Sequence, residues 1–122
     1  MDALAFQTAM ETTSRGGPSV VMSARDIDER RYLKHLPIAL ALLDGPVALA
    51  DDIVALAMKQ VDLWERGSLC SHDYIAEWRH LLSHRPQAAA VLLERSAHAV
   101  ALRQNSPFVS AIRKLQSLAH AA

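Results

Sequence analysis

Apolar residues recur along most of this chain at the three- and four-residue spacing that places side chains on one face of an α-helix. The longest run of this pattern falls within residues 46–66, after the turn signal Asp44-Gly45-Pro46. Its apolar stripe is formed by Val47, Ala50, Val54, Ala57, Val61 and Trp64. Polar residues occupy the other side, so the pattern predicts one long amphipathic helix here.

A corner between two helices is predicted directly after this stretch, within residues 62–78. Gly67 can adopt the left-handed conformation that ends a helix, and the Ser71 hydroxyl can accept the free N–H groups that begin the next one. That next helix is expected over residues 72–84. Each helix brings a tryptophan, and because large aromatic side chains gain most from burial, Trp64 and Trp78 should form the centre of the core.

Two elements are predicted within residues 23–45. Ser23 with Asp26 three residues later resembles a capping box and should begin a highly charged, peripheral helix over residues 24–36. Pro37 can occupy the first position of a new helix. Residues 38–43 are apolar on all sides and indicate a short buried element.

The last third of the chain predicts two further helices. One should begin at Pro86 and continue to about residue 104, with a wide apolar surface at residues 88–93. Ser106-Pro107 is a cap followed by a proline at the first helical position, which starts the final helix. The apolar face of that helix carries Phe108, Ile112, Leu115 and Ala119. Together these patterns predict an all-α fold, a compact bundle of five to six helices with short connections.

The N-terminal residues have a separate pattern. Leu4, Phe6 and Met10 indicate a short helix, and Gly16-Gly17-Pro18 interrupts regular structure after it. We therefore expect an N-terminal helix and flexible linker over residues 1–22 and a single helical domain over residues 23–122.

Composition agrees with the helical pattern and limits the function. Ala and Leu, both strong helix formers, supply 38 of the 122 residues, against 13 Val and Ile. The formal charge is zero, which gives no overall attraction to nucleic acid or membranes. A single cysteine, no secretory signal pattern and no apolar run long enough to span a membrane favour a cytoplasmic protein. No glycine-rich phosphate loop is present, and we expect no cofactor.

Two motifs in the helix predicted at residues 72–84 contain side chains that could bind a metal ion or take part in catalysis. His80 and His84 are four residues apart, a spacing that can place two imidazoles on one metal ion, with Asp73, Glu77 and Cys70 nearby. The simpler interpretation is a solvated helix face, because neither paired cysteines nor a His-Glu-x-x-His order accompanies them. We therefore predict no metal site.

Arg79 and His84 form an Arg-x4-His pattern that resembles the catalytic motif of HEPN-type ribonucleases, which are small helical proteins often found as toxins. The resemblance implies that Arg79 stabilises phosphate charge and that His84 transfers protons. Arg30 and His35 have the same spacing, so the match is not selective. On an ideal helix the two side chains also point about 140° apart. This ribonuclease is the alternative to a non-catalytic role.

Residues 85–122 hold five basic residues against Glu94 alone, a net charge of +4. Arg103, Arg113 and Lys114 flank the Ser106-Pro107 corner, whose following helix offers free N–H groups to an anion. We expect these three residues to contact a partner. Nucleic acid is only weakly supported as that partner. A DNA-binding helix-turn-helix over residues 66–84, as in a transcriptional regulator, would present Asp73 and Glu77 to phosphates.

The segment Ala101-Leu102-Arg103-Gln104-Asn105-Ser106-Pro107-Phe108 resembles one near the end of small helical bacterial proteins of the antitoxin or regulator kind. Trp64, Tyr74, Trp78 and Leu81-Leu82 are similar in order and spacing, so the resemblance covers residues 47–108. It implies a non-catalytic module that binds a protein partner, such as a toxin or nucleotidyltransferase encoded nearby. A homodimer is also open, formed through Phe6 and Met10 or through the surface at residues 88–93.

Overall fold

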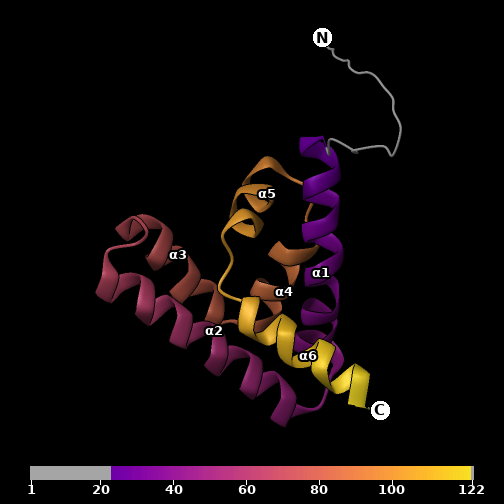
Figure 1. Ribbon diagram of the computed structural model, residues 1–122. Helices are drawn as coiled ribbons and strands as arrows, with labels where there is room; N and C mark the ends of the chain where they lie inside the picture. The colour runs from indigo at the N-terminus through magenta and orange to yellow at the C-terminus, as the bar shows by residue number, and fades with distance from the viewer. Residues whose placement is uncertain (1–22, 122) are drawn as a thin grey trace.

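Six helices joined by short connections form the part of the chain that the computed structural model describes, residues 23–121 (Figure 1). No strand occurs among these residues, which confirms the predicted all-α bundle. The helices are α1 (Ala24–Asp44), α2 (Val47–Gly67), α3 (His72–Leu82), α4 (Arg85–Leu93), α5 (Ala97–Gln104) and α6 (Val109–Ala121). Phe6 and Met10, the predicted N-terminal partner residues, lie outside the described range. None of the six helices is long and apolar enough to cross a membrane.

Helix α1 is the element against which α2, α4, α5 and α6 all pack (Figure 1). The Ser23 Oγ accepts the N–H of Asp26 at 3.1 Å, so the predicted cap is confirmed. The predicted peripheral helix ending at residue 36 is wrong, because Pro37 lies inside one continuous helix. Proline removes one helical hydrogen bond, but His35, Ile38 and Ala39 on either side of it are buried against neighbouring helices, and this burial offsets the loss.

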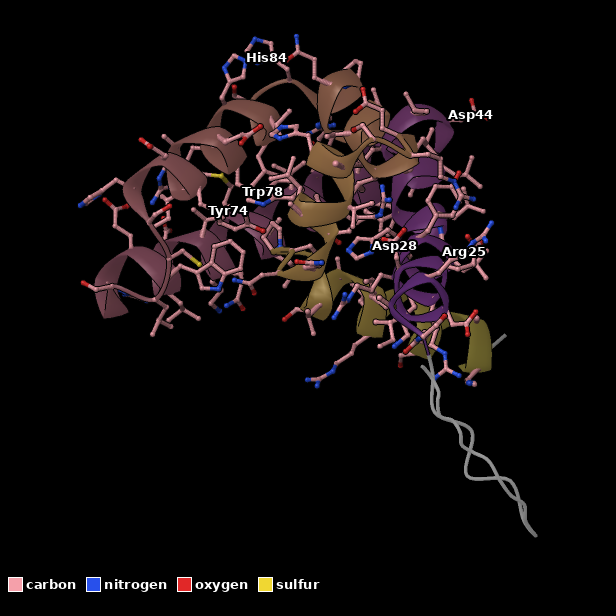
Figure 2. All side chains as sticks on the ribbon, turned by 90° about the horizontal axis from the view of Figure 1, so that it is seen from above. Arg25, Asp28, Asp44, Tyr74, Trp78 and His84 are labelled. Atoms are coloured by element: carbon pink, nitrogen blue, oxygen red, sulfur yellow. The ribbon has the colours of Figure 1, made fainter. Side chains whose placement is uncertain are left out.

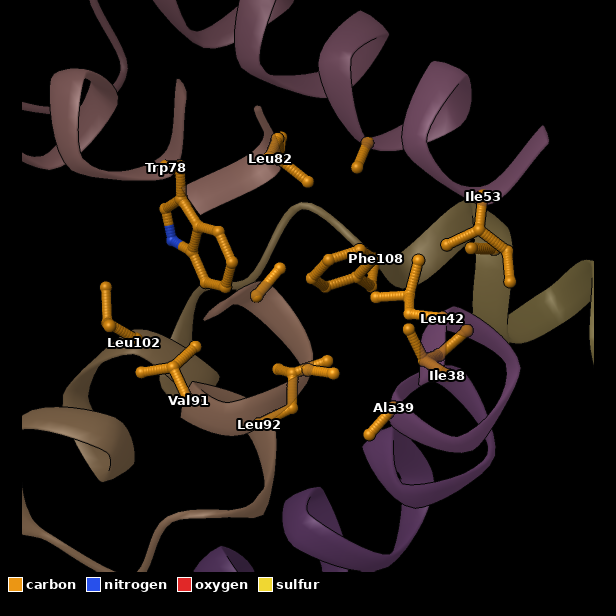
Figure 3. Packing of buried hydrophobic residues seen from close by; sticks show 14 of the residues in the cluster. Ile38, Ala39, Leu42, Ile53, Trp78, Leu82, Val91, Leu92, Leu102 and Phe108 are labelled. Atoms are coloured by element: carbon orange, nitrogen blue, oxygen red, sulfur yellow. The ribbon is translucent and has the colours of Figure 1, made fainter. Parts of the chain in front are cut away.

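The second half of α1 has two apolar faces. Ile38, Ala39 and Leu42 enter the core (Figure 3). Leu40 and Leu43 do not: their exposed fractions are 54% and 51%. The prediction that residues 38–43 would be buried on all sides is therefore wrong, because the other helices cover only one side of α1.

The corner between α2 and α3 is built as the sequence predicts, with one exception. Trp64 and Trp78 retain only 4% and 0% of their exposure, and the Trp78 ring packs edge-on against Phe108 with 5.5 Å between centroids (Figure 3). The Ser71 Oγ caps α3 by accepting the N–H of Tyr74. The left-handed residue is Ser68, with φ of 52°, and not Gly67, which closes the last turn of α2.

The single helix predicted over residues 86–104 is divided into α4 and α5. The Ser96 Oγ accepts the N–H of Ala99 and begins α5, while the preceding backbone at Glu94 is extended. The apolar surface at residues 88–93 is mostly core, since Ala88, Ala89 and Leu92 are buried. Its proposed role as an association surface is therefore wrong.

Replacing Trp78 with alanine tests this account of the core. We expect Trp78→Ala to lower the free energy of unfolding by about 3–5 kcal/mol, as other large aromatic truncations in cores do. Leu69→Ala is the control, because Leu69 is 68% exposed, and it should change stability by no more than about 0.5 kcal/mol. Urea unfolding of both variants measures this. Equal losses would show that the core is centred elsewhere.

Candidate functional site at the crossing of α1 and α6

The structure does not bring Arg79 and His84 together. The Arg79 guanidinium donates to Asp62 at 2.9 Å and to Glu65, both on α2, and these bonds, that to Glu65 above all, raise the pKa of Arg79. The His84 Nδ1 instead lies 2.9 Å from the Ser83 Oγ, and its ring lies 5.0 Å from that of His80. His84 projects at the edge of the molecule (Figure 2). The two residues that the ribonuclease hypothesis needs at one site therefore contact different side chains and do not face each other.

The histidine pair lacks further ligands, and it is not on one helix, because α3 ends at Leu82 and His84 is the N-cap of α4. Within residues 23–121, no group of three or more His, Cys, Asp or Glu side chains is placed to hold a metal ion. Glu77, which shares the predicted metal face with His80 and His84, instead pairs with His98 on α5.

The three basic residues predicted to flank the α5–α6 corner are dispersed. Arg103 is buried, with only 2% of its surface exposed, so its predicted place on a partner surface is wrong. Its guanidinium is held inside because Nη1 donates to the Glu94 carbonyl at 2.6 Å, at the end of α4. Lys114 pairs with Asp52 of α2 at 3.3 Å. Of the three, Arg113 alone is both exposed and beside a cavity.

This cavity, here called the basic pocket, lies between α1 and the α5–α6 corner and has a volume of about 340 Å³. No acidic side chain lines it. Its ionisable and hydroxyl-bearing lining residues are Arg31, Lys34, His35, Arg103, Ser106 and Arg113. Four of these carry a full positive charge, so the basic pocket concentrates positive potential in a protein whose net charge is zero.

His35 and Ser106 join α1 to the α5–α6 corner beside the basic pocket. The His35 Nδ1 lies 2.7 Å from the Arg31 carbonyl oxygen, which can only accept, so Nδ1 carries the proton. In the neutral ring, Nε2 then accepts the Ser106 hydroxyl at 2.6 Å. Burial lowers the pKa of His35, and the positive charges of Arg103 and Lys34 lower it further.

The contact between Ser106 and His35 has the distances of a nucleophile and its base, but its surroundings favour a structural role. Both side chains are buried, with 5% and 4% of their surfaces exposed. The Ser106 Oγ also accepts the N–H of Phe108 at 3.2 Å. The hydroxyl is thus occupied on both sides, and we assign this pair to holding the corner in place.

A second cavity, here called the apolar groove, lies on the outer side of the same crossing and has a volume of about 390 Å³. Its floor is made by Leu33 and Pro37 of α1 and by Ile112, Leu115 and Ala119 of α6. Arg30 and Lys34 also line it, and Lys34 belongs to the basic pocket as well. The two cavities therefore form one continuous surface along the α1–α6 crossing.

Sequence reasoning identified Arg113 and the apolar face of α6, but it missed the contribution of α1. Arg31, Lys34 and His35 lie in a stretch whose charge pattern predicts a peripheral helix, and the buried contact of His35 with Ser106 brings that stretch to the corner. No local pattern indicates a contact across 71 residues.

Protonation of His35 should destabilise the fold. The unfolded chain binds a proton at the ordinary pKa of 6.5, whereas the folded chain resists it until a lower pH. The contribution of neutral His35 to the free energy of unfolding should therefore be fully present above pH 6.5 and be lost as the pH falls below that value. His35→Gln, which does not titrate, should show a weaker fall between about pH 7 and about pH 5. Denaturant unfolding across this range measures the difference, and parallel curves for the two proteins would contradict the assignment.

Comparison of the chain with family models, with curated proteins and with solved structures gave no match. The function of the α1–α6 crossing therefore has to follow from its own side chains.

Proposed function

We propose that this protein is a non-catalytic interaction module that binds an acidic partner protein at the α1–α6 crossing, in the manner of an antitoxin. The observation that carries the proposal is the apolar groove, which is lined by the exposed Leu33 and by Arg30 and Lys34, two cations that form no ion pair within residues 23–121. The resemblance of residues 47–108 to antitoxin- and regulator-type proteins supports the same class of function.

The apolar component comes from the solvent-facing side of α1. Leu33, Leu40 and Leu43 are 55%, 54% and 51% exposed, and their spacing places them on one stripe opposite the core side of the helix. Leu118 of α6 is 52% exposed. Of these four leucines, Leu33 lines the apolar groove, and Leu40 continues its stripe one turn beyond Pro37. An exposed apolar stripe that runs into a groove is typical of association sites. A helix or an extended segment of a partner can bury these side chains.

The charge of the surface indicates whether a different protein or a second copy of this chain binds to it. Elsewhere on the described surface, four cations are paired with carboxylates: Arg79 with Asp62 and Glu65, Arg85 with Asp51, Arg95 with Glu29, and Lys114 with Asp52. The α1–α6 crossing gathers cations without such a pair, since no ion pair within the described residues involves Arg30, Arg31, Lys34 or Arg113. A second copy placed on this surface would set cations against cations. An acidic partner supplies the missing carboxylates and favours association.

The ribonuclease alternative has a direct test. We expect the purified protein to leave several structured and unstructured RNAs intact, because Arg79 is held by two carboxylates of α2. RNA cleavage that disappears in both Arg79→Ala and His84→Ala, with the fold retained, would establish the alternative instead.

The resemblance identifies the first partner to test: a toxin- or nucleotidyltransferase-type protein encoded beside the gene for this chain. We expect the two purified proteins to form a complex whose affinity falls with added salt. Leu33→Asp and Leu40→Asp should each weaken it by about tenfold or more, because each places a charge in a buried apolar contact. Isothermal titration calorimetry measures both effects.

Leu63→Asp is the matched control, since Leu63 is 45% exposed on α2 and does not line the apolar groove. An equal loss in Leu63→Asp would show that the α1 face is not the contact. A wild-type dimer that Leu33→Asp converts to a monomer in light scattering would assign the face to a second copy. Absence of binding would contradict the antitoxin-like form of the proposal.

A further inference from the structure

The basic pocket has a different chemistry from the apolar groove beside it. Arg31 and Lys34 reach it from α1, and Arg113 reaches it from α6. None of these three has a carboxylate within 4.0 Å among the described residues. Three like charges at one cavity repel one another, so this arrangement is stabilised when an anion is bound there.

Arg103 adds a buried charge to the same cavity. Its side chain is fully buried, and its Nε and Nη2 atoms have no hydrogen-bond partner among the described residues. The Asp28 carboxylate lies 3.6 Å from Nη2, which offsets part of the charge without a hydrogen bond. Buried donors without partners are uncommon in folded proteins and are costly in free energy. An anion in the basic pocket, which Arg103 lines, would offset this buried positive charge.

Neutral donors complete the lining. Gln104, Asn105 and Gln116 are neutral polar residues of the lining, although the Asn105 amide donates to the Cys70 Sγ, and Val109, also in the lining, is the first residue of α6. The first N–H groups of a helix have no partner within it and carry a partial positive charge. Such N–H groups together with guanidinium groups favour phosphate oxygens.

We propose that the basic pocket binds a phosphate-type dianion, either inorganic phosphate or the monoester group of a small molecule. Four cations from α1, α5 and α6 surround a cavity of about 340 Å³, within the size range of small-ligand sites. A dianion with several equivalent oxygens can contact donors from all three elements at once, which a single carboxylate cannot do. This site shares Lys34 with the apolar groove, but its ligand is a small anion and not the protein partner assigned to that groove.

The test is an NMR titration of the full chain with inorganic phosphate, and separately with methyl phosphate, at constant ionic strength set with chloride. Saturable shifts are expected for the Arg31 and Arg113 Nε–H groups and for the amides of Val109 and Ser110. The ring signals of His35 should show an increased pKa, because a bound anion favours imidazolium. Saturation by phosphate alone would assign free phosphate, and tighter saturation by methyl phosphate would assign a monoester.

Two variants and a control define the site. Arg31→Gln and Arg113→Gln should each weaken binding by about tenfold or more, the effect of losing one charge-assisted hydrogen bond. Arg66→Gln removes an exposed arginine of α2 that does not line the basic pocket, and it should leave binding unchanged. Thermal unfolding confirms that each variant is folded. Shifts that stay linear, that chloride reproduces, or that Arg66→Gln reduces equally would overturn the proposal. So would saturable binding of a single-stranded oligonucleotide without binding of either phosphate probe.

Discussion

The buried guanidinium of Arg103 is the interaction on which the arrangement of α1, α4 and α5 depends. A helix leaves its last carbonyl groups without partners, and the carbonyls of Val91 and Leu92 at the end of α4 are buried against Arg103. The Arg103 Nη1 donates to the Glu94 carbonyl at 2.6 Å and lies 3.4 Å from that of Leu92. Asp28 of α1 faces the same group at 3.6 Å. One side chain of α5 therefore fixes the end of α4 and the position of α1.

A second arginine reinforces this junction from the surface. The Arg95 guanidinium lies 3.5 Å above the Tyr32 ring and donates to Glu29 at 2.6 Å, and that hydrogen bond lowers the pKa of Glu29. Arg103 also approaches the ring of Tyr32, at 5.3 Å. The first half of α1 is thus held to α4 and α5 mainly by polar contacts, whereas its second half is held by apolar burial. This division leaves Leu33 and Leu40 free to face solvent.

The α2–α3 corner could be predicted from the sequence because its determinants are local: a serine cap, a turn and two tryptophans at helical spacing. The path of α1 through Pro37 and the break before Ser96 could not, since both depend on contacts with residues distant in the chain. Arg103 shows the limit most clearly. A lone arginine near a corner normally indicates a surface position, and only the carbonyls at the end of α4 make its burial favourable. The candidate site was only partly predicted for the same reason, because α1 supplies half of it.

A double-mutant cycle between Arg103 and Asp28 tests this account most directly. Arg103→Met should lower the free energy of unfolding by about 3–5 kcal/mol, since it leaves Asp28 and the carbonyls of α4 without their partner. Asp28→Asn should cost clearly less in the Arg103→Met background than in the wild type, with a coupling of about 1 kcal/mol or more. Urea unfolding of the four proteins gives these values. Additive losses within about 0.5 kcal/mol, or an Arg103→Met variant as stable as the wild type, would contradict the account.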